Sequence, residues 1–530
     1  MIAMPDRARQ IGGMTTQLSN FTTRLSTLSG RTIVLALASV KLLIHLNANR
    51  GYGYFRDELY FFTCGDRLDW GYADHPPLVA VASAVGRGLF GDSLSGVRLL
   101  PAISGALLVV VAGAIAREMG GRRFAQALAA VSVIASPILL AQTNFLSMNA
   151  FEPLIWMTFA LLVIRIIRGA DPRWWLAAGA VAGIGMQNKY SMAFFGASVV
   201  GGLLLTPERR ILANRWAWAG AAVALAVWFP NVVWNVAHDW PILEILRNAG
   251  SGKNYEMSPL EFFTRQIVLG GPAAFPIWIA GIVYLIAGTR VRAYRALGIS
   301  AILLFVILVL LRGKDYYFGP IFPMLMAAGA IAVEHAAERP LVTWLRPVSL
   351  AGVVLSGIVF APLVLPVLGV DRFIAYTAAL GLGHAKTENH RMGRLPQFYA
   401  DMHGWEEMVS AVAQAWGTLS EDEKSRAAIF TDNYGEAGAV DFFGPKYGLP
   451  KAISGHQNYF LWGPRGYTGD VMVTVGVDEE DLRKYFASVE EAARVHCGDC
   501  MPYEDDGPVF VCRGIVKPLP EVWAVTKNWR

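Results

Sequence analysis

The sequence predicts a polytopic α-helical membrane protein of about eleven transmembrane helices, followed by a C-terminal extracytoplasmic α/β domain. The chain of 530 residues is 54% hydrophobic and only 16% charged, with a mean hydropathy of +0.39. Soluble domains carry about 25% charged residues, so a soluble cytosolic enzyme is excluded. Residues 1–370 hold 48 charged side chains with a net charge of +12, whereas residues 371–530 hold 39 with a net charge of −7. We therefore expect a basic, apolar membrane body and a separate, more acidic domain.

Eleven apolar runs are long enough to cross a hydrocarbon core of about 30 Å. The first reads as a retained signal anchor, because the residues before it are too polar for a cleaved signal peptide. We assign residues 1–30 to a cytoplasmic N-terminal segment, 31–370 to the transmembrane domain and 371–530 to the soluble domain. The runs lie near 31–48, 95–116, 124–142, 148–167, 174–187, 190–205, 216–234, 263–287, 296–311, 318–336 and 347–369.

Arginine marks every second connection between these runs, and cytoplasmic loops hold the excess of basic residues. With the N-terminus inside, every inner loop is basic and the C-terminal domain lies outside the cytoplasmic membrane. The arginines that set this orientation are Arg117, Arg122, Arg123, Arg165, Arg168, Arg173, Arg209, Arg210, Arg215, Arg290, Arg292, Arg295, Arg339 and Arg346.

The C-terminal segment alternates short apolar strands with amphipathic stretches. Strands are expected at 427–431, 471–475 and 508–512, and helices at 405–416, 436–443 and 478–486. All four cysteines, Cys64, Cys497, Cys500 and Cys512, lie on the predicted outer side, where disulfides form. We expect at least one disulfide among the last three, and a pairing of Cys64 with this domain stays open.

The first outer loop, residues 50–93, contains the sequence RDELYFFTCGDRLDWGYADHPPL. Asp57 and Glu58 are adjacent carboxylates, and Asp74 with His75 stands near the end of the segment. Carboxylates at the mouth of a membrane body can act as a general base or bind a metal ion. The alternative is that Asp57 and Glu58, together with Arg56, form only an interfacial salt bridge.

Glu152 enters the otherwise apolar run 148–167. A lone carboxylate there costs roughly 2–3 kcal/mol unless it is paired or faces water. A cation on the same side, or a metal shared with Asp57, would compensate it, and a purely structural ion pair is the alternative. The candidate cations are Arg56, Lys189, Arg312 and Lys314.

Lys189, Arg312 and Lys314 lie on the predicted outer side, where basic residues are disfavoured. Arg312 and Lys314 stand in the sequence RGKDYYFGPIFP, which includes Tyr317. These cations predict an anionic ligand, and phosphate at the membrane surface is the natural one. The alternative is that they extend toward anionic lipid head groups.

These motifs resemble the membrane-embedded GT-C glycosyltransferases. An acidic pair in a long first outer loop, an acidic residue at the fourth span, a lysine between later spans and the RGKDYYFGPIFP stretch carry the resemblance. RDELYFFTCGDRLDWGYADHPPL, NYGEAGAVDFFGPKYGLP and CMPYEDDGPVFVC are similar to the bacterial glycosyltransferase family 39 branch, related to protein mannosyltransferases and the lipid A aminoarabinose transferase.

The resemblance implies an inverting enzyme that uses a polyprenyl-phosphate-linked sugar on the outer face of the bacterial cytoplasmic membrane. Asp57 would be the general base, and Glu58 would assist at the acceptor or metal. Lys189, Arg312 and Lys314, with Tyr317, would bind the donor phosphate. Glu152 departs from the aspartate frequent in relatives, which leaves a divalent ion such as Mg²⁺ or Mn²⁺ open; Asp74 and His75 are the other acceptor or metal candidates.

The predicted partners are the lipid-linked donor and membrane lipids, with no nucleic acid. A transporter or flippase is the alternative function, although its charged sites usually lie near the midplane within paired halves. A non-catalytic scaffold is the third reading. The sequence does not identify the sugar or the acceptor.

Overall fold

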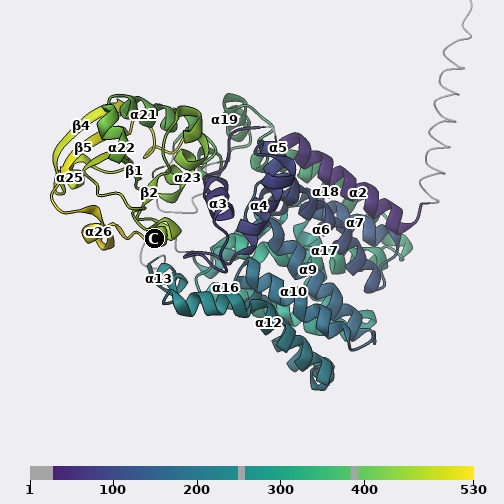
Figure 1. Cartoon of the computed structure of the whole chain (residues 1–530). Helices are drawn as coiled ribbons and strands as arrows, with labels where there is room; N and C mark the ends of the chain where they lie inside the picture. The colour runs from purple at the N-terminus through teal and green to yellow at the C-terminus, as the bar shows by residue number, and fades with distance from the viewer. Residues whose placement is uncertain (1–27, 50, 249–256, 383–390, 392, 530) are drawn as a thin grey trace, which may run out of the picture.

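The computed structural model describes residues 28–49, 51–248, 257–382, 391 and 393–529. Within them, a body of long helices carries a smaller domain with a β-sheet at one end (Figure 1). The predicted fold class, a polytopic helical protein with a C-terminal α/β domain, is confirmed. Most of the predicted N-terminal segment, residues 1–27, lies outside the described residues.

The helical body is built from apolar segments whose polar flanking residues begin the helices. Ser29, Asn214 and Ser258 each accept a backbone N–H bond in the first turn, as N-terminal caps do. The helices are α2 (Gly30–Ala48), α5 (Leu94–Val97), α6 (Leu99–Glu118), α7 (Arg123–Ala135), α8 (Pro137–Gln142), α9 (Met148–Ile167), α10 (Trp174–Asn188), α11 (Ser191–Leu204), α12 (Arg215–Ala237), α13 (Pro241–Asn248), α14 (Pro259–Gly270), α15 (Phe275–Ala287), α16 (Arg295–Leu310), α17 (Phe322–Ala336), α18 (Leu345–Val364) and α19 (Val370–Ala379), with 3-10 turns η1 (Pro207–Ala213), η3 (Thr289–Tyr294), η4 (Asp315–Ile321) and η5 (Pro340–Val342).

The described part of the chain contains seven helices long and apolar enough to span a membrane, or up to nine if two bent helix pairs each count once. The predicted number of eleven is not confirmed. The run at 124–142 is divided into α7 and α8, which begins at Pro137, and α10 has only 15 residues. A helix of 13 residues such as α7 is about 20 Å long, short of a hydrocarbon core of about 30 Å.

Small residues let the helices approach closely, as in other membrane bundles. A Cβ atom on Gly179 would lie 1.9 Å from the carbonyl oxygen of Gly220, where α10 meets α12. A Cβ on Gly281 would lie 2.0 Å from the Leu325 carbonyl oxygen, where α15 meets α17. These contacts hold together helices next to the candidate site residues: Lys189 directly follows α10, and η4 directly precedes α17.

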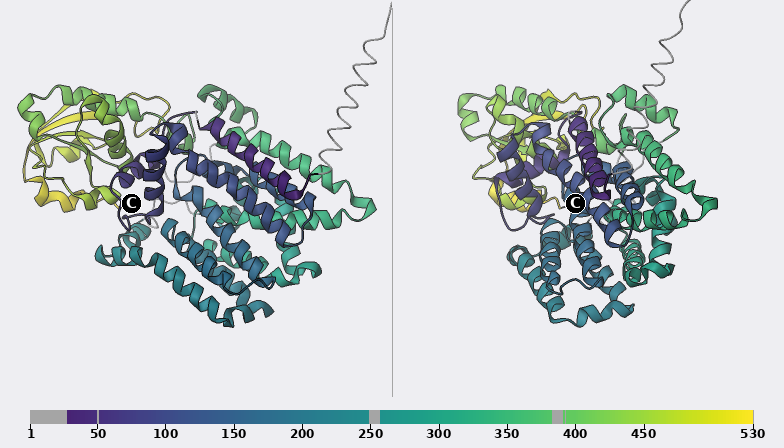
Figure 2. Two further views of the ribbon diagram at one scale, coloured as in Figure 1. Left: turned by 45° about the vertical axis from the view of Figure 1, so that its right-hand side comes forward. Right: turned by 90° about the vertical axis from the view of Figure 1, so that its right-hand side faces the viewer.

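The two ends of the helical body differ in chemistry. Figure 1 and the left view of Figure 2 show the sheet domain at one end and the start of α2 at the other. At the α2 end, Arg123 reaches the Leu28 carbonyl, and Arg122 and Arg290 bind Glu338 at 2.9 and 3.1 Å. The predicted basic loops therefore gather at the end opposite the sheet domain.

The first outer segment forms two helices, α3 (Arg56–Asp66) and α4 (Leu78–Phe90), rather than an open loop. Leu59 and Tyr60 of α3 and Val79 of α4 share a buried core with the C-terminal domain, which contributes Val409 and Ala437 among others. The segment therefore packs between the helical body and the C-terminal domain, as the views in Figures 1 and 2 show.

The C-terminal domain is a mixed five-stranded sheet with helices packed on it, in the order β2-β1-β3-β5-β4. β1 pairs in parallel with β2 and β3, and β5 pairs antiparallel with β3 and β4. Its elements are β1 (Ala428–Thr431), β2 (Ile453–Ser454), β3 (Val471–Val475), β4 (Phe486–Arg494), β5 (Pro508–Ile515), α20 (Gln397–Ala400), α21 (Trp405–Gly417), α22 (Glu421–Arg426), α23 (Tyr434–Phe443), α24 (Gln457–Trp462), α25 (Glu479–Leu482), α26 (Leu519–Val522), η6 (Gly444–Tyr447) and η7 (Trp523–Thr526).

One predicted element of this domain is wrong. The helix expected at 478–486 is only one turn, α25, and the next segment forms the long edge strand β4. The sequence FASVEEAAR is rich in glutamate and alanine, which disfavour strands, but pairing with β5 overrides this preference.

Candidate active site

Three consecutive charged residues at the start of α3 point to three parts of the molecule. Arg56 contacts the C-terminal domain, Asp57 contacts Tyr434 of α23, and Glu58 contacts Arg98 at the start of α6. Successive helical residues are rotated by about 100° around the axis, so neighbours face different sides. The helix start is therefore a junction between the membrane body and the domain.

Glu58 occupies a sealed structural position. Its carboxylate accepts bonds from Arg98 Nη2 at 2.7 Å and Nε at 3.0 Å, and from the backbone N–H groups of Phe55 at 2.9 Å and Leu146 at 2.8 Å. Both charged side chains are fully buried. The sequence predicts that Glu58 assists at the acceptor or metal; the structure instead commits both carboxylate oxygens to internal donors.

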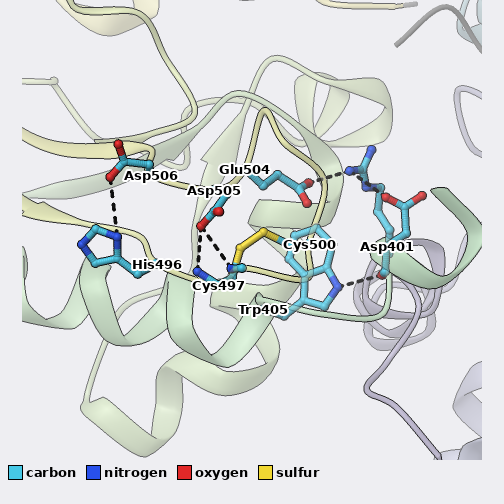
Figure 3. Close-up of a disulfide and its surroundings, with 10 residues drawn as sticks. Asp401, Trp405, His496, Cys497, Cys500, Glu504, Asp505 and Asp506 are labelled. Carbon is cyan, nitrogen blue, oxygen red and sulfur yellow. Dashed lines mark hydrogen bonds and ion pairs between the residues drawn. A yellow bond between two sulfur atoms is a disulfide. The ribbon is translucent and has the colours of Figure 1, made fainter. Parts of the chain in front are cut away.

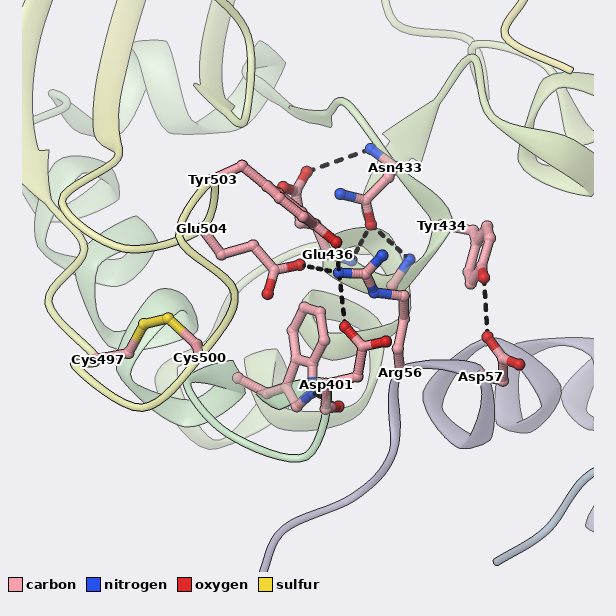
Figure 4. A network of polar contacts seen from close by, with 12 residues as sticks. Arg56, Asp57, Asp401, Asn433, Tyr434, Glu436, Cys497, Cys500, Tyr503 and Glu504 are labelled. Carbon is pink, nitrogen blue, oxygen red and sulfur yellow. Dashed lines mark hydrogen bonds and ion pairs between the residues drawn. A yellow bond between two sulfur atoms is a disulfide. The ribbon is translucent and has the colours of Figure 1, made fainter. Parts of the chain in front are cut away.

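Arg56 reaches into the C-terminal domain (Figure 4). Its guanidinium lies 3.0 Å from Asp401 and 2.5 Å from Glu504, donates to the Tyr503 hydroxyl and lies over the Trp405 ring. Burial lowers the pKa of Arg56, but the charges of Asp401 and Glu504 more than offset this and hold it above its usual value. Arg56 thus joins α3 to the domain and is not the partner of Glu152.

Asp57 faces the C-terminal domain from the next position on α3. The hydroxyl of Tyr434 donates to Asp57 Oδ1 at 2.8 Å (Figure 4). Burial, followed by the charge of Asp57, raises the pKa of Tyr434 well above its usual value, so the phenol remains a donor at neutral pH. The ring of Tyr434 lies 4.9 Å from that of Tyr60, which places a second tyrosine beside this contact.

Asp74 and His75 have different surroundings. Asp74 accepts a bond from the Tyr60 hydroxyl at 2.8 Å and is partly exposed, and its charge acts on Tyr434 together with that of Asp57. His75 is fully buried: Nδ1 lies 2.8 Å from the Pro76 carbonyl oxygen and Nε2 lies 3.8 Å from Cys64 Sγ. Asp74 therefore belongs to the same site as Asp57, whereas His75 is packed inside the fold and borders the site only through Asp74, whose Oδ1 lies 4.0 Å from His75 Nε2.

Glu152 is paired with Lys189. Lys189 Nζ lies 3.0 Å from Glu152 and donates to Asn149 at 2.7 Å, and Ser191 donates to the other Glu152 oxygen. Glu152 is 2% exposed and Lys189 is 15% exposed, so the cation lies on the more open side of the pair. Of the candidate cations, Lys189 supplies the compensation that an intramembrane carboxylate requires.

The tyrosines of η4 connect this pair with Asp57. Lys189 Nζ lies 4.3 Å from the ring centroid of Tyr317 and 5.5 Å from that of Tyr316. The charges of Glu152 and Asp57 both act on Tyr316. The candidate base and the candidate phosphate-binding lysine are thus both near one tyrosine.

Arg312 and Lys314 come just before η4, after the C-terminal end of α16. Arg312 is exposed and has a left-handed backbone, with φ of 51°, and Lys314 is half-buried at the start of η4. Asp315, beside them, is paired with Arg265 of α14 at 3.1 Å. Arg265 was not distinguished by the sequence from other arginines, because only the packing of α14 against η4 brings it here.

A divalent metal is poorly matched by these carboxylates. Glu58 is committed to Arg98, Glu152 to Lys189 and Ser191, and Asp74 accepts from Tyr60. Within the described residues, Cys497, Cys500 and Asp505 are the one group of three metal-ligand side chains whose ligand atoms all lie within 4.8 Å. Because those two sulfurs are bonded to each other, this group lacks the free thiolates that would bind a metal ion.

The disulfide joins Cys497 to Cys500 at the beginning of a loop that supplies Arg56 with two partners (Figures 3 and 4). Asp505 accepts from the backbone N–H of Cys497 at 2.9 Å, and the loop presents Tyr503 and Glu504 to Arg56. Cys64 and Cys512, the other disulfide candidates, are buried free thiols. A bridge from Cys64 to the domain is therefore wrong: its sulfur faces His75 within the first outer segment.

Residues 74–234 match the family model described as dolichyl-phosphate-mannose-protein mannosyltransferase. The chain is 28% identical over 232 residues to the lipid A galacturonosyltransferase RgtD of Rhizobium johnstonii, covering 42% of this chain and 47% of that protein. It is 27% identical over 158 residues to the polyprenol-phosphate-mannose–protein mannosyltransferase of Corynebacterium glutamicum, covering 25% and 30%. The chain thus spans less than half the length of these relatives.

The fold extends the likeness over nearly the whole chain. The apo crystal structure of ArnT from Cupriavidus metallidurans superposes with a TM-score of 0.61 at 16% identity, covering 90% of this chain and 97% of ArnT. The structure of that protein bound to undecaprenyl phosphate superposes with a TM-score of 0.60 at 16% identity, covering 91% and 97%. The chain is an integral membrane protein with the GT-C glycosyltransferase fold, and the resemblance indicated by its sequence motifs is confirmed.

Proposed function

We propose that this protein is an inverting glycosyltransferase that moves a sugar from a polyprenyl-phosphate donor to a lipid, glycan or protein acceptor. The observation that carries the proposal is that Asp57 and the Lys189–Glu152 pair are both near Tyr316: the charges of Asp57 and Glu152 act on this tyrosine, and Lys189 Nζ lies 5.5 Å from its ring centroid and 3.0 Å from Glu152. A carboxylate and a cation so placed are the groups that this transfer needs. The relatives RgtD and the mannosyltransferase, and the undecaprenyl phosphate in the ArnT structure, support the substrate class.

The chemistry is a single displacement at the anomeric carbon of the sugar. The acceptor oxygen forms a bond to this carbon while the bond from the carbon to the phosphate oxygen breaks on the opposite face, which inverts the configuration. Asp57 takes the proton of the acceptor hydroxyl as general base. The bonding electrons leave with the phosphate, and Lys189 stabilises the charge that grows there.

Lys189 is suited to this role because protein acceptors take only some of the hydrogen-bond donors of its ammonium group. An ammonium group has three N–H donors, and Asn149 and Glu152 take two of them. Glu152 therefore holds the lysine in place while the ammonium keeps a donor for phosphate. Arg312 and Lys314, which lie beside Tyr316 and Tyr317 in the chain, would add positive charge where the donor head group approaches.

The remaining acidic candidates take different roles in this proposal. Glu58 fixes the start of α3 through Arg98 and so positions Asp57, while Asp74 is the acidic residue placed to contact the acceptor. We propose that transfer needs no divalent ion, since the carboxylates are engaged with protein donors. Transfer should then persist in excess EDTA, and its loss would show that a divalent ion is required.

The orientation proposed from the sequence places the C-terminal domain outside the bacterial cytoplasmic membrane. The basic loops gather at the end opposite this domain, which supports an inside location for that end. The Cys497–Cys500 disulfide supports an oxidising compartment for the domain. Reporter fusions after Arg122 and after Arg530 should report opposite compartments, and matching signals would reject this topology.

The function is tested with purified protein in lipid nanodiscs and a panel of polyprenyl-phosphate sugars. The wild type should consume one donor and release polyprenyl phosphate, and Asp57→Asn should not. Asp66→Asn is the matched control, because Asp66 is an exposed carboxylate of the same helix paired with Arg87. A transporter would move a donor across vesicles without cleaving it, and a scaffold would tolerate Asp57→Asn; either result would overturn the proposal.

A further inference from the structure

The C-terminal domain contacts the proposed general base through the side chain of Tyr434. Tyr434 and Asp57 are separated by 377 residues in the chain, yet the tyrosine hydroxyl donates to the carboxylate at 2.8 Å. We infer that Tyr434 is a positioning residue that fixes the Asp57 carboxylate and favours its ionised form, so that the C-terminal domain completes the active site. This inference rests on the proposed function.

The sequence NYGEAGA around Tyr434 is built to make this contact. Asn433 caps α23 by accepting from the backbone N–H groups of Gly435 at 2.9 Å and Glu436 at 3.1 Å, and Glu436 accepts from the Asn433 N–H at 3.2 Å. This reciprocal cap fixes the first turn of the helix, where Tyr434 stands. The motif has no other role in the proposed chemistry.

Two glycines of the same motif allow α23 to lie directly against α3. A Cβ atom on Gly435 would be 2.5 Å from Arg56 Cγ, and one on Gly438 would be 2.7 Å from the carbonyl carbon of Leu59. The backbone of Leu59 could not move aside for a side chain at position 438 as a flexible side chain could. The close approach brings Tyr434 within hydrogen-bond distance of Asp57.

The side chain of Tyr434 is also fixed from its flanks. Its ring lies 4.9 Å from the rings of both Tyr60 and His456, so the hydroxyl has little freedom to turn away. Charged and titratable groups of several neighbouring elements surround this contact. They are Arg56 and Tyr60 of α3, Asp74 before α4, Tyr316 of η4 with Lys189 and Glu152 near it, and His456 before α24.

The contact has a defined chemical consequence. A hydrogen bond donated to a carboxylate favours its charged form, which is the form that accepts the acceptor proton. The bond also holds Oδ1 toward the domain, and because the carboxylate is rigid, this fixes the position of its second oxygen as well. Loss of the Tyr434 hydroxyl should therefore lower kcat and move the acid limb of the pH–rate profile to higher pH. The affinity for the polyprenyl-phosphate sugar should not change.

The test compares Tyr434→Phe with the wild type in nanodiscs, using the polyprenyl-phosphate sugar that the wild type consumes. We expect kcat to fall roughly ten-fold, as for loss of a hydrogen bond to a charged group, with KM for the donor unchanged and the acid limb at higher pH. Tyr459→Phe is the matched control: it removes another buried tyrosine hydroxyl of this domain, 3.0 Å from Asp441. Its pH profile should match that of the wild type.

A double-mutant cycle with Asp57→Asn separates a local effect from loss of structure. If Tyr434 acts through Asp57, the phenylalanine should cause no further loss in the Asp57→Asn background. Equal additional losses in both backgrounds, or an unchanged pH profile in Tyr434→Phe, would overturn the inference and leave the proposed function intact. Failure of the wild type to cleave any donor would instead overturn the proposed function.

Discussion

Two buried ion pairs lie at the end of the helical body that carries the C-terminal domain, and they differ in how completely they are enclosed. In Glu58–Arg98 both side chains are fully buried and the carboxylate also accepts two backbone N–H bonds. In Glu152–Lys189 the carboxylate is 2% exposed but the lysine is 15% exposed and lies over two tyrosine rings. The first pair is closed to any ligand, whereas the second presents its cation toward the site. The exposure of the cation therefore distinguishes the two pairs: a fully buried cation serves only structure, whereas a partly exposed one can bind substrate.

The largest effect should come from breaking the closed pair. Arg98→Ala leaves the Glu58 carboxylate buried without its counter-charge, which typically costs 3–5 kcal/mol. We expect poor accumulation of the protein and a strongly reduced thermal midpoint in detergent. Arg394→Ala is the control, because the ion pairs of Arg394 with Asp371 and Asp499 involve exposed side chains and are worth at most about 1 kcal/mol. Similar stability of the two variants would refute the assignment.

The next effect concerns the residue beside the closed pair. Asp57→Asn keeps the size of the side chain but cannot accept a proton, so transfer should fall by roughly 10² to 10⁴. Donor binding, measured by equilibrium titration in nanodiscs, should be retained, and the thermal midpoint should be close to that of the wild type. Loss of donor affinity with normal turnover at saturation would exchange the roles of Asp57 and Glu152.

Breaking the Glu152–Lys189 ion pair should have an intermediate effect. Lys189→Ala removes a charged donor from the phosphate, for which 1.5–3 kcal/mol is typical, so donor affinity should fall roughly 10- to 150-fold. Lys446→Ala, which removes an exposed lysine paired with Glu406 on the C-terminal domain, should leave donor affinity unchanged. A Lys189→Ala protein with a lowered thermal midpoint but normal donor affinity would make this pair structural as well.

Sequence reasoning predicted the helical body and the basic loops and selected Asp57 and Lys189 as candidates, because these depend on composition and local position. It could not distinguish Glu58 from Asp57, since adjacent carboxylates differ only in the side of α3 that each faces. It also missed Arg98 and Tyr434, whose roles depend on contacts between distant segments. Edge strand β4 was missed for a similar reason: its glutamates and alanines favour a helix until β5 supplies a partner.

The smallest effect should follow from opening the disulfide, because it acts on the site only through Arg56. Closing so short a loop contributes about 2 kcal/mol by chain entropy, so Cys497→Ser with Cys500→Ser should lower the thermal midpoint modestly. Transfer should fall by no more than a few-fold, since Asp401, outside the disulfide loop, still binds Arg56 at 3.0 Å. Alkylation of the unfolded, unreduced protein should label the buried thiols Cys64 and Cys512 alone. Labelling of all four cysteines would contradict the disulfide, and a hundred-fold loss of transfer would mean that this loop, like Tyr434, acts directly on the catalytic carboxylate.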